Sequence, residues 1–183
     1  SLKSLDEVIN IFRNVDLMVN SINEKSGKNI DSEEMYLMVI SIINDYTTDF
    51  SSIDLDTLYS EMEMLLMNYM PLLYSDDTLE VLNTIKNNGK STISLLSNTG
   101  FIKGRTLRKI LNELSIDQYL DFQLYSDEVR MSKPNPLFYQ LMLDQIDKER
   151  HQELQLSDII HIGDNYHADV LGSETCGIKS SQA

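Results

Sequence analysis

The sequence predicts an α/β fold, in which a Rossmann-like parallel sheet carries helices on both faces and follows a small α-helical bundle. Two observations support this prediction. In residues 73–183, short strand-like runs alternate with segments of helical periodicity, which is typical of a parallel sheet. Residues 1–72 show helical periodicity alone, which is typical of a bundle. The 183 residues have the length of one domain, or of one domain with a smaller appendage.

Three helices are expected in the bundle, because apolar residues recur there at helical spacing after polar residues that can cap a helix. Ser4 can cap the first helix, which ends near Gly27. Asp31 or Ser32 opens the second helix and Asp54 opens the third. The bundle is therefore expected to pack around the apolar stripes of these three helices.

In the second part of the chain the expected helices are 76–89, 102–114, 137–146 and 166–176, and the expected strands are 92–96, 122–125, 159–162 and 179–183. The run at 159–162 is short and apolar, so we expect a strand that is buried on both faces. This strand and the one at 92–96 are too apolar for sheet edges, and each buried backbone group without a partner costs about 1–3 kcal/mol. Hydrogen-bond accounting therefore predicts a further strand between them.

Composition excludes several classes of function. Hydrophobic residues make up 42% of the chain and charged residues 24%, as in soluble globular proteins. The net charge of −14 disfavours nucleic acids and anionic membranes as partners, because both require a basic surface. No apolar run approaches the roughly 20 residues of a membrane span. The single cysteine, Cys176, cannot form an internal disulfide, so we read it as a small buried hydrophobe and expect a cytoplasmic protein.

Two carboxylates follow the strand at 159–162. Gly163 and Asp164 end the apolar run, and Asp169 lies five residues further along, in the helix that follows. Ligands bind at the carboxyl ends of strands in open α/β sheets, and two acids at such an end can converge on a hard cation such as Mg²⁺. The alternative is that Asp164 only ends the strand and Asp169 is a solvated helix residue.

Two further polar stretches lie at other strand or loop ends. Ser97 and Asn98 begin a turn into a helix, where a hydroxyl and backbone N–H groups can hold phosphate oxygens. Lys133 precedes a helix that Asn135 can cap and Pro136 can open, so its ammonium is suited to neutralising a phosphoryl group. Taken alone, Ser97 is also compatible with a simple turn, and Lys133 with a surface lysine.

In this order and at these spacings, the three stretches resemble motifs two, three and four of the haloacid dehalogenase superfamily, which is dominated by phosphatases. The resemblance covers about residues 72–183. It implies that Ser97 and Asn98 bind the transferring phosphoryl group, that Lys133 steadies it and the nucleophile, and that Asp164 ligates Mg²⁺ with Asp169 as a further acid beside it. Residues 1–72 then resemble the helical cap of the family.

The chain departs from the family at motif one, which supplies the aspartate nucleophile at the end of a first strand. Asp54-Leu55-Asp56-Thr57 is similar in letters, but the helical stripe of the third helix runs through it, so we read Asp54 as a helix cap. We therefore expect the chain to be a piece of a longer protein that supplies a central strand before residue 1 and the end of the last strand.

The resemblance implies an Mg²⁺-dependent phosphatase that acts on a small phosphorylated metabolite through an aspartyl-phosphate, with its nucleophile outside these residues. A non-catalytic relative that uses the fold for binding or assembly is the alternative, because the remaining groups only position and neutralise. A 2-haloacid dehalogenase is a further alternative, although that reaction requires no metal. We assign no role to His151, His161 or His167, and expect His161 to be an ordinary packed residue of a strand.

Overall fold

The computed structural model describes residues 2–150 and 155–183. The N-terminal helices are α1 (Leu5–Ser26), α2 (Ser32–Ile43) and α3 (Leu55–Asn68), with a short 3₁₀ helix at Phe50–Ser52. The next elements are α4 (Thr78–Asn87), β1 (Ser94–Ser97), α5 (Gly104–Glu113), a 3₁₀ helix (Asp117–Tyr119), β2 (Phe122–Tyr125) and α6 (Ser126–Val129). The last are α7 (Pro136–Arg150), a 3₁₀ helix (Leu156–Asp158), β3 (Ile160–Gly163), a π-helix (Tyr166–Leu171), α8 (Gly172–Thr175) and β4 (Lys179–Gln182).

The first and third helices begin where their capping residues predict. Ser4 and Glu7 form a capping box at the start of α1, and Gly27 ends this helix with a left-handed φ of 66°. Asp54 accepts hydrogen bonds from the backbone N–H groups of Asp56 and Thr57 at the start of α3. The interpretation of Asp54 as a helix cap, rather than as a nucleophile at the end of a strand, is therefore confirmed.

Within residues 2–150 and 155–183, four strands form two separate parallel pairs, β1–β2 and β3–β4. In the first pair Ser94 lies opposite Phe122, and in the second Ile160 lies opposite Lys179. Parallel pairing with intervening helices confirms the predicted α/β class. The pairs are not joined into one sheet, because β1 and β3 have no strand between them in the part of the chain that the structure describes.

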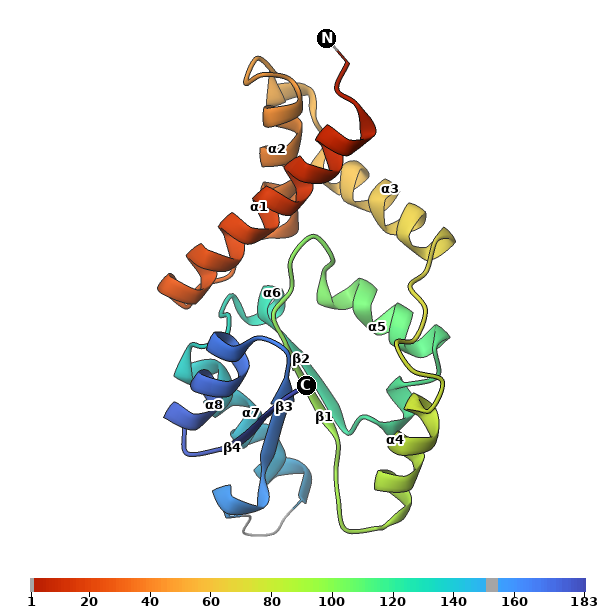
Figure 1. Ribbon diagram of the computed structural model, residues 1–183, viewed down its shortest axis with the longest axis vertical. Coiled ribbons are helices and arrows are strands. Elements are labelled where there is room, and N and C mark those ends of the chain that lie inside the picture. The colour runs from red at the N-terminus through yellow and green to blue at the C-terminus, as the bar shows by residue number, and fades with distance from the viewer. Residues whose placement is uncertain (1, 151–154) are drawn as a thin grey trace.

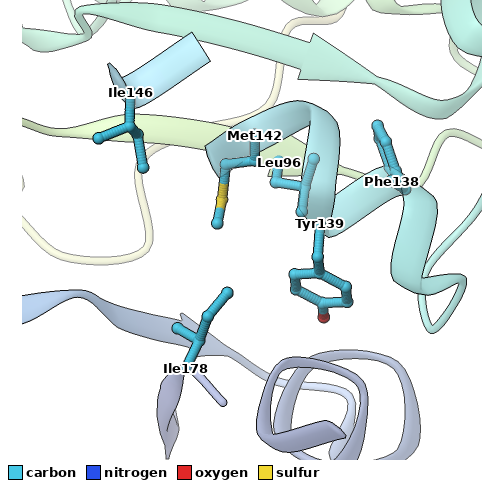
Figure 2. Packing of buried hydrophobic residues seen from close by; sticks show 6 residues of the cluster. All are labelled: Leu96, Phe138, Tyr139, Met142, Ile146 and Ile178. Atoms are coloured by element: carbon cyan, nitrogen blue, oxygen red, sulfur yellow. The ribbon is translucent and has the colours of Figure 1, made fainter. Parts of the chain in front are cut away.

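Helices cover the strand pairs from two sides (Figure 1). Helices α4 and α5 lie on one side, and α7 and α8 on the other. Figure 2 shows the larger core cluster, in which Phe138, Tyr139 and Met142 of α7 pack against Leu96 of β1 and against Ile178, which directly precedes β4. The cluster thus joins the two strand pairs on the face covered by α7.

The opposite face of β3 is open, which corrects the expectation that this strand is buried on both faces. The side chains of Ile160 and Ile162 are 57% and 63% exposed, because no described segment covers them. The side chain of His161 points to the other face and is 10% exposed. The apolar run identified the strand correctly, but burial depends on neighbours that the described residues do not supply.

The N-terminal helices stand over the carboxyl ends of the strands (Figure 1). The Tyr36 hydroxyl donates to the carbonyl oxygen of Phe101 in the loop after β1, at 3.1 Å. Ser126, which follows β2, donates to Asn29 at 2.7 Å, and Asn165, which follows β3, donates to Glu24 at 3.0 Å. Asn135, in the loop that carries Lys133, donates to the Gly27 carbonyl oxygen at the end of α1 at 2.9 Å. The N-terminal bundle therefore contacts all three loops that carry the predicted site. The division of the chain into domains at residue 72 stays a prediction.

Candidate functional site

The predicted site residues lie at the carboxyl ends of the strands and in the loops that follow. Ser97 is the last residue of β1, and Asp164 directly follows β3. Lys133 lies in the connection between α6 and α7, and its backbone precedes the helix that Pro136 opens. Asn135 accepts a hydrogen bond from the N–H of Leu137 at 3.0 Å, as expected for the residue that caps α7.

Lys133 and Asp169 form a buried ion pair at the centre of the site. The Lys133 Nζ atom lies 2.5 Å from Asp169 Oδ1, and the two side chains are 10% and 5% exposed. The same Nζ donates to the carbonyl oxygen of Leu96 in β1 at 2.8 Å. This one ammonium therefore bridges the two strand pairs, at the position where the sequence predicts a missing strand.

Asn98 links the first polar stretch to the second. Asn98 Oδ1 accepts a hydrogen bond from the backbone N–H of Lys133 at 2.7 Å, and Asn98 Nδ2 donates to the Lys133 carbonyl oxygen at 3.0 Å. The Asn98 side chain thus positions Lys133, a role that the sequence did not indicate. The Ser97 hydroxyl donates to the carbonyl oxygen of Asn98 at 3.1 Å and is half-buried in the turn.

Both oxygens of Asp169 are engaged by the protein. Oδ1 lies 3.0 Å from His161 Nε2 as well as contacting Lys133, and Oδ2 accepts the backbone N–H of Asn165 at 3.0 Å. Gly163 permits this arrangement, because a Cβ atom at that residue would lie 2.3 Å from Asp169 Cγ. Asp169 is therefore directed toward Lys133, and the expectation that it converges with Asp164 on one cation has no support in this geometry.

The environment of Asp169 keeps its carboxyl group ionised. Burial alone would raise its pKa, but the hydrogen bonds from His161 and Lys133 and the charge of Lys133 outweigh that effect. The pKa of Asp169 therefore lies well below its usual range. The charged form is stabilised by specific donors, as in sites where a carboxylate holds a lysine in place.

Asp164 differs from Asp169 in being exposed to solvent. Its carboxylate has no hydrogen bond or ion pair within residues 2–150 and 155–183, and its carbonyl oxygen accepts a hydrogen bond from Gln182 at 3.2 Å. Within the same residues no three His, Cys, Asp or Glu side chains gather closely enough to hold a metal by themselves. Mg²⁺ is commonly held by one or two carboxylates together with water and substrate phosphate, so Asp164 fits as one ligand of such a site.

A profile of the haloacid dehalogenase-like hydrolases matches residues 6–183. The chain belongs to the haloacid dehalogenase-like hydrolases. Two curated relatives are the rhythmically expressed gene 2 protein of Drosophila melanogaster, 33% identical over 75 residues, and an uncharacterized hydrolase of Schizosaccharomyces pombe, 26% identical over 110 residues. The matches cover 41% and 56% of this chain but only 28% and 46% of those proteins.

Solved structures of this family share the fold at low identity. The hydrolase YfnB of Bacillus subtilis, bound to magnesium, matches with a TM-score of 0.73 and 13% identity, over 97% of this chain and 73% of that one. L-2-haloacid dehalogenase of Xanthobacter autotrophicus gives 0.65 and 14%, over 97% and 64%. A phosphatase of the family from Thermococcus onnurineus gives 0.56 and 19%, over 96% and 78%. The solved structures that share this fold therefore include a phosphatase and a dehalogenase.

Sequence reasoning missed one residue of the candidate site. His161 was expected to be an ordinary packed residue, yet its ring lies against Asp169 and against Tyr139. The alternation of β3 side chains placed His161 on the opposite face from Ile160, which was a usable signal. His167 is exposed, and His151 lies outside the described residues.

Three other expectations concern Cys176, a membrane-spanning helix and the helix at 166–176. Cys176 is half-buried beside the core cluster, where burial raises the pKa of its thiol, so it packs as a small hydrophobe. Across residues 2–150 and 155–183, no helix combines the length and apolar character that crossing a membrane requires. The helix expected at 166–176 is a π-helix followed by α8, and the π-helix carries Asp169.

Proposed function

We propose that this chain forms the cap and most of the core of an Mg²⁺-dependent phosphatase that hydrolyses small phosphate monoesters. The observation that carries the proposal is the Lys133 ammonium, held by Leu96 and Asp169 at the carboxyl end of the strands. An ammonium has three hydrogens, and these two contacts use two of them. The third is left to meet an anionic oxygen at the mouth of the site, next to the turn that Ser97 begins.

The proposed roles follow from these positions. Ser97 and the turn after it bind the phosphoryl oxygens, with Asn98 holding Lys133 beside them. Lys133 neutralises the phosphoryl group and the nucleophile, and Asp169 keeps Lys133 in place. Such preorganised charge is among the largest contributions to catalysis, because it acts where negative charge develops.

The open carboxylate of Asp164 is the proposed metal ligand in this chain. Bound Mg²⁺ supplies neutralisation of charge on the phosphoryl oxygens. The magnesium reported for YfnB, which shares the fold, supports this choice of metal. Asp164 would supply one of the oxygen ligands, and its exposure leaves it accessible to a cation from solvent.

We further propose that a strand from outside the 183 residues lies between β1 and β3 and carries the aspartate nucleophile. Just before β1, the carbonyl oxygen of Ile93 accepts from the backbone N–H of Asp121 on the β2 side, so the backbone groups of Ser94 and Leu96 face away from β2. On that side the Leu96 carbonyl oxygen accepts from Lys133 Nζ, at the carboxyl end of β1. The carbonyl of Gly163 accepts from Ala183 on the β4 side, so the backbone of Ile162 faces away from β4. Each pair thus presents one open edge to a parallel strand.

A carboxylate oxygen of an aspartate on such a strand would attack the phosphorus atom and displace the alcohol of the ester, forming an aspartyl-phosphate. Water would then release inorganic phosphate and restore the carboxylate. The alternatives differ in measurable ways. A 2-haloacid dehalogenase would release halide without Mg²⁺, and a non-catalytic relative would show neither activity. The ion pair of Lys133 and Asp169 favours an enzyme, because burying two charges is costly for a protein that needs only a scaffold.

The test compares the 183-residue chain with an N-terminally extended chain. Both are assayed with p-nitrophenyl phosphate, with and without Mg²⁺, and with 2-chloropropionate, and both are melted thermally. We expect the extended chain to melt at a higher temperature and to hydrolyse the phosphate ester only with Mg²⁺. The control is the extended chain with Asp164→Asn, which should keep its stability and lose its response to Mg²⁺.

The proposal is wrong if the two chains melt alike and neither releases phosphate. Release of chloride from 2-chloropropionate without Mg²⁺ would assign the dehalogenase chemistry instead. Higher stability of the extended chain, with neither activity, would retain the added strand and leave the binding or scaffold function.

A further inference from the structure

His161 is a partly buried histidine beside the charged pair of the proposed site. Its side chain is 10% exposed, and its Nε2 atom lies 3.0 Å from Asp169 Oδ1. Lys133 contacts the same oxygen, on the side toward β1. His161 therefore completes a row of three side chains in which Asp169 is the middle member.

The direction of the hydrogen bond follows from the charge of Asp169. This carboxyl group is ionised, because its donors hold its pKa well below the usual range, so it acts only as an acceptor. His161 must then carry its hydrogen on Nε2 and donate. The ring is also held by an edge-to-face contact with Tyr139, at 5.4 Å between ring centres and 81° between planes.

Tyr139 is itself fixed in place. Its hydroxyl donates to the carbonyl oxygen of Ala168 at 2.6 Å, and its side chain is fully buried. Ala168 directly precedes Asp169 in the π-helix. The support for the carboxylate thus comes from α7, β3 and the π-helix together.

We propose that His161 is a positioning residue, which fixes the Asp169 carboxylate and through it the direction of the Lys133 ammonium. With donors on both oxygens, the carboxylate cannot rotate without breaking a hydrogen bond. Loss of the His161 donor leaves Oδ1 with Lys133 alone and the carboxylate with the Asn165 N–H as its one other donor, so the pair can shift. The third N–H bond of the Lys133 ammonium is then no longer held in one orientation toward the mouth of the site.

This inference rests on the proposed function for its effect on catalysis, but the ordering of Lys133 is measurable without any activity. Two substitutions of His161 distinguish the effect of its N–H donor from the effect of its ring packing against Tyr139. His161→Phe keeps an aromatic ring against Tyr139 and removes the donor. His161→Gln places an amide N–H at the same number of bonds from Cα as Nε2, so it can restore the hydrogen bond. His167→Phe is the matched control, because His167 is exposed.

The first measurement is the ¹H–¹⁵N signal of the Lys133 ammonium in the N-terminally extended chain, assigned by its loss in Lys133→Met. An ordered ammonium gives a sharp signal at low temperature. We expect this signal to remain in the parent chain, His161→Gln and His167→Phe, and to broaden or disappear in His161→Phe. A melting curve of each variant confirms that the compared samples are folded.

The second measurement is kcat and KM for p-nitrophenyl phosphate in the same variants. Removing the hydrogen-bond partner behind a metal ligand commonly costs about 10- to 100-fold in activity, and we expect a loss of the same size in kcat when His161→Phe removes the partner behind the Lys133–Asp169 pair. His161→Gln should recover most of it, and His167→Phe should match the parent.

An unchanged Lys133 signal in folded His161→Phe overturns the inference, as does equal loss of signal in His161→Gln and His161→Phe. If the Lys133 signal depends on His161 as expected while the parent chain hydrolyses no phosphate ester, the positioning role stands and the proposed function fails. A signal that depends on His161 with kcat unchanged in His161→Phe contradicts the catalytic consequence of the inference.

Discussion

The helical cap and the α/β core differ in how much of their own apolar surface and backbone they satisfy. In the cap, Val15 and Val19 of α1 pack against Met35 and Val39 of α2, and all four are at most 2% exposed. In the core, Ile162 of β3 is 63% exposed, and the inner edges of β1 and β3 have no strand partner among the described residues.

The difference follows from the two kinds of secondary structure. A helix satisfies its backbone hydrogen bonds within one segment, so α1 and α2 can form a small core by contacts between neighbouring helices. A strand requires neighbours on both edges, and those neighbours are often distant in sequence. The core of the cap is thus formed by segments close in sequence, with Phe101 packed against it, whereas the inner edges of β1 and β3 lack strand partners among the described residues.

The largest expected effect breaks the core at its charged centre. Asp169→Asn leaves the Lys133 ammonium buried without a counter-charge, which typically costs about 3–5 kcal/mol of a total stability of about 5–15 kcal/mol. Urea denaturation measures the change. Asp45→Asn is the control, because Asp45 pairs with Lys3 at an exposed position of the cap, and it should leave the midpoint unchanged. A midpoint in Asp169→Asn equal to that of the parent would contradict the ion pair.

The same carboxylate predicts an acid-dependent stability. The folded-state pKa of Asp169 lies below its ordinary value near 3.8, so its contribution is fully present above that pH and is lost as the pH falls toward the folded-state value. The difference in unfolding free energy between the parent chain and Asp169→Asn should be constant from pH 7 to about pH 5 and shrink below about pH 4. A difference that grows on acidification would reverse the assigned sign.

The next largest expected effect is a loss of stability from truncating a buried side chain in the cap. Met35 is fully buried between α1 and α2, so Met35→Ala should cost about 2–5 kcal/mol through lost burial and an unfilled cavity. Met64 is 59% exposed, and Met64→Ala should stay within about 0.5 kcal/mol of the parent. Equal costs for both substitutions would show that the cap core is not packed as described. Thermal melts of the two variants make the comparison.

A smaller effect is expected where the backbone approaches Asp169. The Cβ of Gly163→Ala would lie 2.3 Å from Asp169 Cγ, so the carboxylate must move, at a cost of about 1–3 kcal/mol. At Gly100 an added Cβ meets only an ordinary contact of 3.4 Å with Asp16, which makes Gly100→Ala the control. Denaturation midpoints of the two variants should differ, and identical midpoints would show that Asp169 has room to move.

The smallest expected effect concerns Ile162, on the exposed face of β3. Ile162→Ala should change the stability of the 183-residue chain by no more than about 0.5 kcal/mol, because this side chain is mostly exposed there. In the N-terminally extended chain the same substitution should cost more, since an added strand buries surface beside β3. The same change in both chains would contradict a strand next to β3. Urea denaturation of the four proteins provides the comparison.

The sequence by itself determined the features that depend on neighbouring residues. The capping box of Ser4, the left-handed turn at Gly27 and the cap at Asp54 are local, and the structure has each of them where the sequence predicts it. The order of strands and helices and the family motifs also follow from local patterns. These signals were enough for the fold class, and they bring Ser97, Lys133 and Asp169 to the same end of the strands.

Only the tertiary structure decided which groups touch across that end. The contacts of Lys133 with Leu96, of Asn98 with the Lys133 backbone and of His161 with Asp169 join residues from different elements. The separation of the strands into two pairs was decided in the same way. Side-chain direction and burial depend on how distant segments pack, and periodicity along the chain carries no information about the segment that lies opposite.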